Sequence, residues 1–520
     1  MTNSAASMRT LIAYAIIIPA AIFVGCVLTD PLNYGTLGFL GLVLVLLASP
    51  IFIKWHYPIM VFGLACPMTC FFLVGSPPLA QVVVLLSLGI AVIGRTVNSE
   101  NQFISEPLVT WPLLFVLIMT IMTAELTGGI NLHALSGGGL NDSVGGGKKY
   151  IAVFVGVAMY FALTSRPIPR EKWKWYLMLY FLPAVFGVIS DLYFYLPSPL
   201  NYINLFFPPI SSVDPGESFD QIRFRATAFA TSAVPVYLLA RYGLRGVFLE
   251  GKLWRPVLFL ACFAFSLLGG FRNIFGYFGL MLLLLFVLER LYRTRLLPVL
   301  LLLGIVGSLL LAVFSDKLPY TIQRSMCFLP LKWNTSVIMD AEGSSEWRFK
   351  IWRAVLPKVP DYLLLGKGYA LSKEDYQDIG QGTFAALNRS HINASEESLA
   401  ISGDYHSGPL STLIAFGIWG AMGIVWLMAA TLLVVYRNYR YGPAELQTFN
   451  TFMLAQCISA IVIFFFVFGG FQNDIGNFAK LAGFSIAMNW GIAKRPPRTA
   501  YNPVVHKPVK SLPQPSSQPA

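Results

Sequence analysis

Arginine and histidine gather in one polar stretch of a chain that is otherwise almost continuously apolar. Between Asp316 and His406, about ninety residues of mixed polar sequence interrupt the hydrophobic runs, and they carry these basic residues: Arg324, Arg348, Arg353, Arg389, His391 and His406. A guanidinium group presents a fork of N–H donors that matches phosphate oxygens, and histidine exchanges protons near neutral pH. The stretch therefore predicts a site for an anionic ligand, with phosphate as the first candidate.

A polar and aromatic run surrounds Arg348. Residues 344–353 read Ser-Ser-Glu-Trp-Arg-Phe-Lys-Ile-Trp-Arg, which predicts the start of an amphipathic helix with Ser345 as its N-cap and Pro357 as its end. Such a helix can lie on a membrane surface and hold Arg348 toward a site. Two further substrate-binding candidates come from the same run: Trp352 and Arg353.

His406 closes the polar stretch, directly before an apolar run from Leu410 to Val435. This position places the histidine at the water boundary of a predicted transmembrane helix. A histidine there can act as a general base or bind phosphate. The alternative is an interfacial histidine without a chemical role.

Two more arginines stand where a charge is costly. Arg272 lies within Gly269-Gly270-Phe271-Arg272-Asn273, which joins two apolar runs with almost no loop, so its side chain must lie near the membrane surface. Arginine at that depth is expensive unless it faces water or an anion. Arg225 precedes another apolar run at the same face, and pairing with a nearby carboxylate such as Asp220 is its alternative role.

Membrane helices must position these residues. The chain has 520 residues, of which 56% are hydrophobic and 12% charged, whereas about a quarter are charged in soluble proteins. A hydrocarbon core about 30 Å thick needs roughly 20 apolar residues per helix. The sequence therefore predicts an all-α polytopic membrane protein with about 12–14 transmembrane helices and one large, partly helical periplasmic loop. The predicted spans begin near Leu11, Thr36, Tyr57, Pro78, Leu108, Tyr150, Trp175, Thr227, Pro256, Asn273, Leu296, Gly408, Thr448 and Ile475.

Four segments follow from this pattern. Residues 1–315 are predicted to form a bundle of about eleven spans, and residues 316–407 the large loop with its amphipathic helix. Residues 408–493 hold about three C-terminal spans. Residues 494–520 are basic and rich in proline, so we expect a disordered cytoplasmic tail.

The distribution of lysine and arginine predicts the orientation. With a cytoplasmic N-terminus, the short cytoplasmic loops hold about nineteen basic residues and the opposite short loops about five. The positive-inside rule then places both termini in the cytoplasm and the large loop outside, which in a bacterial inner membrane is the periplasmic face. The net charge of +12 follows from this topology. We predict no nucleic-acid binding, because no aromatic and basic platform accompanies the dispersed charges.

Other common chemistries find no support in the sequence. The six cysteines lie mostly inside predicted spans, without the spacing of a disulfide framework or a metal site. No nucleophile elbow, phosphate-binding loop or His-Glu-Xaa-Xaa-His motif is present. We therefore predict no metal and no cofactor.

The chain resembles the O-antigen ligase and O-antigen polymerase family of bacterial envelope membrane proteins. The resemblance covers roughly Phe265 to Gly420 and the many-span architecture. Three motifs carry it in this order: Gly269 to Asn273, Trp347 to Gly368 with its Leu-Leu-Gly-Lys-Gly end, and His406 to Gly420. The family commonly has His-Asn where this chain has His406-Ser407.

The resemblance implies an enzyme that transfers a glycan from an undecaprenyl-diphosphate carrier at the periplasmic face, without a metal. Its partners would be that lipid-linked donor, a glycan or lipid acceptor, and membrane lipids, as in lipopolysaccharide or exopolysaccharide synthesis. Under this reading Arg272 and Arg348 contact the diphosphate, with Arg225 and Arg324 as weaker candidates. His406 activates the acceptor hydroxyl or contacts phosphate.

Two other functions compete with this one. The many spans also suit a secondary transporter or a flippase for lipid-linked glycans, but the long outer loop and the lack of an internal repeat do not. A non-catalytic envelope scaffold would leave Arg272 at the bilayer edge without an explanation. The fold alone does not separate these functions.

Overall fold

The computed structural model describes residues 34–98, 103–127, 146–197, 200–209, 223–294, 296–369 and 405–495, with short helical pieces between residues 14 and 25. Across these ranges the chain folds into helices and forms no strand beyond one isolated bridge, between Thr69 and Pro78. The predicted all-α fold is confirmed. The predicted C-terminal tail lies outside the described residues from 496 onward.

The chain is a multi-pass membrane protein. Six stretches in the described ranges are long and apolar enough to cross a membrane, and two shorter apolar helices accompany them. The six are Leu79–Val97 (α3), Pro107–Leu126 (α4), Gly147–Thr164 (in α5, Gly146–Thr164), Arg170–Asp191 (which contains α6, Trp173–Phe181, and α7, Val188–Asp191), Gly408–Tyr441 (α18) and Ala444–Phe466 (which contains α19, Gln447–Phe466). The shorter two are Trp254–Gly269, which contains α10 (Trp254–Ser266), and α11 (Arg272–Leu288).

The first described helix differs from its prediction. The predicted spans near Thr36 and Tyr57 are one continuous helix, α2 (Tyr34–Gly63), with Pro50 and Pro58 inside it. Prolines are tolerated in membrane helices because neighbouring groups satisfy the freed carbonyls. The separate span near Tyr57 is therefore wrong, and α3 follows only at Leu79.

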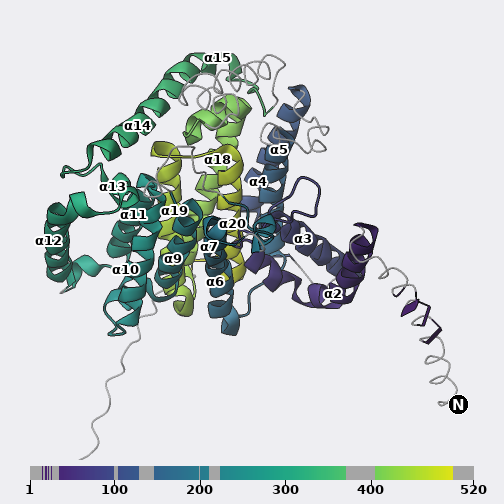
Figure 1. Cartoon of the computed structure of the whole chain (residues 1–520). Helices are drawn as coiled ribbons and strands as arrows, with labels where there is room; N and C mark the ends of the chain where they lie inside the picture. The colour runs from purple at the N-terminus through teal and green to yellow at the C-terminus, as the bar shows by residue number, and fades with distance from the viewer. Residues whose placement is uncertain are drawn as a thin grey trace, which may run out of the picture.

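The core lies where the C-terminal helices meet the fourth and fifth helices of the chain. Helix α20 (Phe471–Asn489) packs along α5, and α18 contacts α4, α19 and α20. Figure 1 shows α18, α19 and α20 in the middle of the bundle, between the N-terminal helices and the α9–α12 group. Phe416, Phe471 and Phe484 are fully buried here. This packed centre fixes the helix ends that carry the polar residues.

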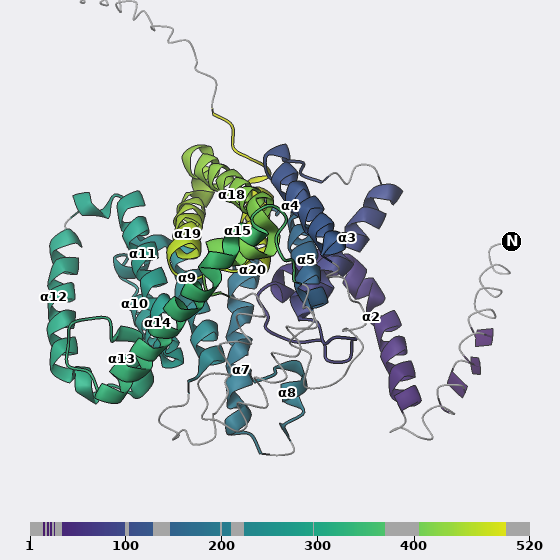
Figure 2. The same ribbon diagram turned by 90° about the horizontal axis from the view of Figure 1, so that it is seen from above.

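A second group of helices supports the predicted arginine positions. Helix α9 (Arg225–Phe248) packs against α10 and α19, and α11 packs against α19. Helix α12 (Leu296–Phe314) stands at the edge of the bundle in both views (Figures 1 and 2). Because α9 and α11 both start at the same end of the bundle, Arg225 and Arg272 begin neighbouring helices there.

The polar stretch folds over that end of the bundle. Helices α13 (Tyr320–Met326) and α14 (Thr335–Val355) lie above α10 and α11 in Figure 1, and α15 (Val359–Tyr362) lies above α18. The expected helix start at Ser345 is wrong, because α14 begins ten residues earlier and Asn334 caps it by accepting from the Ser336 amide. Helix α14 does end before Pro357, as expected.

Residues 363–368, which follow α15, form backbone hydrogen bonds with α18 where that helix is kinked. Helix α18 is kinked at Gly417, and the amide of Ile418 donates to Leu363 O (2.7 Å). In return, the amides of Lys367 and Gly368 donate to Ile414 O (2.7 Å) and Ala415 O (2.8 Å). The turn that contains Gly366 and Gly368 therefore packs closely against the backbone of α18, which gives this turn a structural role.

Candidate functional site

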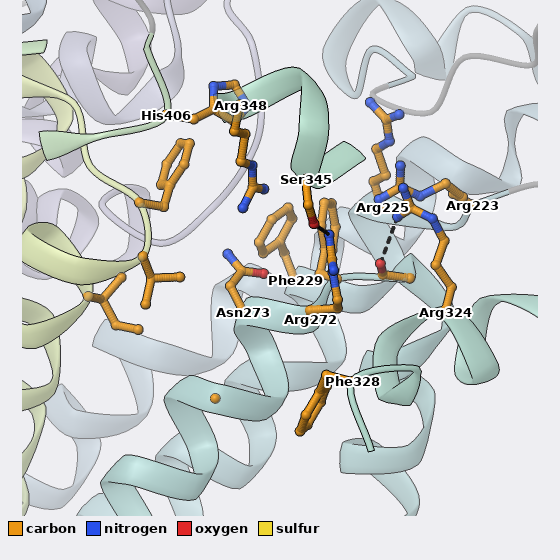
Figure 3. A pocket seen from close by; sticks show the side chains of 16 residues that line it. Arg223, Arg225, Phe229, Arg272, Asn273, Arg324, Phe328, Ser345, Arg348 and His406 are labelled. Atoms are coloured by element: carbon orange, nitrogen blue, oxygen red, sulfur yellow. Dashed lines mark hydrogen bonds between the residues drawn. The ribbon is translucent and has the colours of Figure 1, made fainter. Parts of the chain in front are cut away.

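A cavity of about 660 Å³ opens beneath α14 at this end of the bundle. Helices α9, α11, α13 and α14, the residues before α18 and the link between α19 and α20 all contribute to its wall. Of the described residues that line it, none is acidic, and these are basic: Arg223, Arg225, Arg272, Arg324, Arg348 and His406. Figure 3 shows their side chains around one space. We call this cavity the arginine pocket.

Arg272 lies at the centre of the pocket wall. As the first residue of α11, it projects toward α14, where its Nη2 donates to Ala341 O (3.1 Å) and to Ser345 Oγ (3.0 Å). These two acceptors are neutral, so they orient the guanidinium without cancelling its charge. Ser345, expected as an N-cap, instead joins α14 to Arg272.

Two other arginines hold the turn before α11. Gly270 has φ of 65°, and a side chain there would press against Arg223 Nε and the Arg324 side chain, so this position favours glycine. Arg223 Nε donates to Gly269 O (3.1 Å), and Arg324 Nη1 donates to Gly270 O (2.9 Å). Arg324 also pairs with Asp340 of α14. The charge of Arg324 is thereby partly neutralised, and its contacts stabilise the turn before α11.

Arg348 has no such acidic partner in the described part of the chain. It lies three residues after Ser345 on α14, and Figure 3 shows it pointing toward Asn273 with His406 beside it. Its Nε is buried without a hydrogen bond to any described residue. Burial, together with the charges of Arg272 and Arg324, lowers the pKa of Arg348 from its ordinary value. The positive charges repel one another here, which is an arrangement that a bound anion would relieve.

His406 is held in an uncommon backbone conformation beside the pocket. Its φ of 51° is in the left-handed region, which is unfavourable for a side chain and persists only when the surroundings impose it. Its ring meets the edge of Phe468, with the two ring centres 5.1 Å apart. A side chain at Gly469 would collide with Gly408, so the α19–α20 link and the start of α18 are in close backbone contact.

That link is fixed in turn by α20. The carboxylate of Asp474 accepts from the Gly470 amide (2.8 Å), at the end of the segment that carries Phe468. His406 is therefore positioned by the start of α18 on one side and by the α19–α20 link on the other.

The predicted residues do not all reach the pocket. Arg272, Arg348 and His406 line it together with Arg225 and Arg324. Trp352 does not line it, because its Nε1 donates to Tyr405 O (2.8 Å) and anchors α14 to the residue before His406. Arg353 is exposed outside the pocket. The geometry therefore assigns Trp352 to positioning and gives no support to substrate binding by Arg353.

Three further side chains of the pocket were not predicted. Asn273 follows Arg272 directly in the same motif, so its position next to a functional candidate was an available signal. Phe468 precedes Gly469-Gly470, a glycine pair before a helix like the Gly269-Gly270 pair before α11. Ser345 lies in the predicted segment, but only the contact across to α11 shows what it binds.

A membrane-spanning helical bundle with a strongly cationic pocket at one end defines the class of this protein. Residues 256–425 match the model of the O-antigen ligase family. The predicted resemblance is confirmed. The matched range contains Arg272, Arg324, Arg348 and His406, whereas Arg225 precedes it. No curated protein matches the chain. The family supports glycan transfer of the O-antigen ligase or polymerase type.

Proposed function

We propose that this protein transfers a glycan from an undecaprenyl-diphosphate carrier to a hydroxyl of a glycan or lipid acceptor. The observation that carries the proposal is the arginine pocket, whose described lining contains five arginines and one histidine without an acidic residue. Most of its lining residues lie within the O-antigen ligase family match, which supports a lipid-linked diphosphate as the bound anion. The product would be a lipopolysaccharide or another envelope polysaccharide.

The reaction needs one bond to form and one to break. The acceptor oxygen attacks the anomeric carbon of the donor sugar, and the bond between that carbon and the diphosphate oxygen breaks with its electron pair. Arg272 and Arg348 stabilise the charge that develops on the leaving diphosphate, with Arg225 nearby. His406 accepts the acceptor's proton. The fixed guanidinium groups supply the positive charge, so the proposed step uses neither a metal nor a cofactor.

The proposed orientation places the arginine pocket at the periplasmic face of a bacterial inner membrane. The support is the charge of the short loops. Helices α9, α11 and α18 start at the pocket end, and these basic residues lie in the last turns of α9 and α18 or directly after α11: Arg241, Arg245, Arg290, Arg293, Arg437 and Arg440. This distribution fits a cytoplasmic far end.

A secondary transporter or lipid flippase is the second candidate, because a polar cavity continues into the bundle. About 570 Å³ in volume, it shares Ile463 and Phe468 with the arginine pocket. Polar residues of α20 line it at helical spacing: Asn473, Asp474, Asn477 and Lys480. Polar side chains among membrane helices often mark a ligand path. Under glycan transfer, Lys480→Met should keep most activity, whereas a transporter that uses this path should lose transport.

Two experiments test the proposed function. Deletion of the gene should cause a lipid-linked glycan to accumulate, and the wild-type gene should restore its transfer to the acceptor. An alkaline phosphatase fusion at Gly380 should be active, and one at Pro503 inactive. Absence of the accumulated lipid would contradict glycan transfer, and the reverse fusion pattern would contradict the face.

A further inference from the structure

A second cavity adjoins the arginine pocket at Arg272. It measures about 370 Å³, and its wall includes Phe328 and these residues of α14: Ile338, Glu342, Glu346 and Phe349. It shares Arg272, Phe328 and Ser345 with the arginine pocket, so the two cavities are neighbours. We call this second cavity the α14 groove.

The charge of the α14 groove is opposite to that of the arginine pocket. Its only basic lining residue among those described is Arg272, whose Nη2 already donates to Ala341 O and Ser345 Oγ. Glu342 and Glu346 are one helical turn apart and both exposed, and neither forms an ion pair with the described part of the chain. Two carboxylates repel a phosphate group. The groove is therefore unsuited to a second phosphate.

Aromatic rings accompany these carboxylates. Phe328 and Phe349 are 53% and 56% exposed, so most of each ring is available for contact. A carboxylate accepts strong hydrogen bonds from hydroxyl groups, and an aromatic ring packs against the C–H faces of a ligand. A sugar ring presents both kinds of surface. The groove volume lies within the range of small-molecule sites.

We propose that the α14 groove is a carbohydrate subsite, which binds a sugar residue while the diphosphate occupies the arginine pocket. Glu342 and Glu346 accept hydrogen bonds from its hydroxyl groups, and Phe328 and Phe349 pack against its ring. This inference rests on the proposed function, because it takes the arginine pocket as the diphosphate site. The sugar belongs to the glycan that the lipid carrier brings, and an acceptor built from the same sugars presents the same chemistry to the groove.

The test compares three probes on purified protein in nanodiscs. The first is sugar-free undecaprenyl diphosphate. The second is the lipid-linked glycan extracted from cells that lack the protein, and the third is the oligosaccharide released from that lipid by mild acid. The dissociation constant of each is measured for the wild type, the Glu342→Ala/Glu346→Ala variant, and Asp361→Ala as a matched control. Asp361 is an exposed acid of α15 that does not line the groove.

The double variant should weaken binding of the lipid-linked glycan by about tenfold or more, since it removes hydrogen bonds between sugar hydroxyls and two charged groups. Binding of the sugar-free lipid should change less than about twofold, as should all binding by Asp361→Ala. Weakening of the lipid-linked probe alone assigns the groove to the donor sugar. Weakening of the released oligosaccharide as well assigns it to a sugar that binds without the lipid.

Unchanged binding of both sugar-bearing probes would overturn the subsite. Equal weakening of the sugar-free lipid would also overturn it and make the groove a lipid-contact surface. Failure of the proposed function gives a different pattern, in which sugar-free undecaprenyl diphosphate does not bind the wild type or binds Arg348→Ala equally well.

Labelling of Cys327 in the wild-type protein gives a second measurement that needs no groove variant. Cys327 lines the groove, and burial raises the pKa of its thiol, so alkylation is followed at alkaline pH by peptide mass spectrometry. The lipid-linked glycan should slow this reaction at least threefold more than the sugar-free lipid does. Equal rates with both lipids would contradict a sugar in the groove.

Discussion

Charged side chains have different surroundings at the two ends of the helical bundle. At the far end, polar groups satisfy one another: Glu289 accepts from the amides of Leu244 (2.8 Å) and Arg245 (2.9 Å), and Glu106 accepts from the amide of Ile492 (2.9 Å). At the α14 end, the arginine pocket has no acidic residue in its described lining, and Asp340, which pairs with Arg324, lies outside that lining.

The polar groups at the far end support the fold, whereas those at the α14 end are suited to bind a ligand. A carboxylate that accepts two backbone amides at a helix end stabilises the fold. Several arginines around one cavity cost stability in the absence of a ligand, because like charges are brought together and partly desolvated. Such an excess of positive charge fits a site whose missing partner is an anion.

The largest loss of activity should follow a change at the histidine of the pocket end. His406→Ala should lower glycan transfer by roughly 10²- to 10⁴-fold, because the acceptor hydroxyl loses its base. His406→Lys should not restore the rate. The measurement is transferred glycan per amount of membrane-inserted protein. Normal transfer by the alanine variant would reduce His406 to an interfacial residue.

Loss of one pocket arginine should lower the transfer rate about as much as loss of one oxyanion-hole donor lowers the rate of other enzymes. Arg348→Ala should reduce transfer by roughly 10²- to 10³-fold, because a developing charge on the diphosphate is left without its partner. The matched change at the far end is Glu289→Gln, which should lower the melting temperature while the rate per folded protein stays within about threefold. If both variants lose activity equally, the contrast between the two ends fails.

Ligand binding should have a smaller effect, visible in the stability of the protein. Inorganic diphosphate should raise the melting temperature of the wild type, because an anion that binds only the folded state stabilises it. The lowered pKa of Arg348 shows that its charge is disfavoured in the unliganded pocket, so Arg348→Ala should not lower the melting temperature and should reduce the shift with diphosphate. A thermal shift series with sodium sulfate as the ionic-strength control measures both effects.

The smallest effect should come from the arginine that the fold leaves outside the pocket. Arg353→Ala should change transfer by less than about twofold, since an exposed charge away from the site contributes little. The same transfer assay as for Arg348→Ala applies. A loss near that of Arg348→Ala would show that the pocket in use differs from the arginine pocket.

The sequence predicted the helical membrane fold and the grouping of Arg272, Arg348 and His406 because these depend on strong local signals. Hydropathy identifies the spans, and an arginine between two spans with almost no loop must lie near the membrane surface. It did not predict where α14 begins, since Gly343 and two serines interrupt the pattern while Asn334 caps the helix from further back. The sequence also could not show that Arg348 lines the pocket while Arg353 and Trp352 do not. Burial and the contact of Trp352 with Tyr405 depend on tertiary packing.

Glycan transfer from the diphosphate carrier must release undecaprenyl diphosphate together with the glycosylated acceptor. Purified protein in nanodiscs receives the lipid-linked glycan and its acceptor, without added nucleotide or divalent metal, and both undecaprenyl diphosphate and glycosylated acceptor are quantified. We expect the two products to appear in equal amounts with the wild type, and Arg348→Ala to form both at least about a hundredfold more slowly. Formation of neither product by folded, lipid-binding wild-type protein, or equal rates for the two proteins, would contradict glycan transfer from the diphosphate carrier.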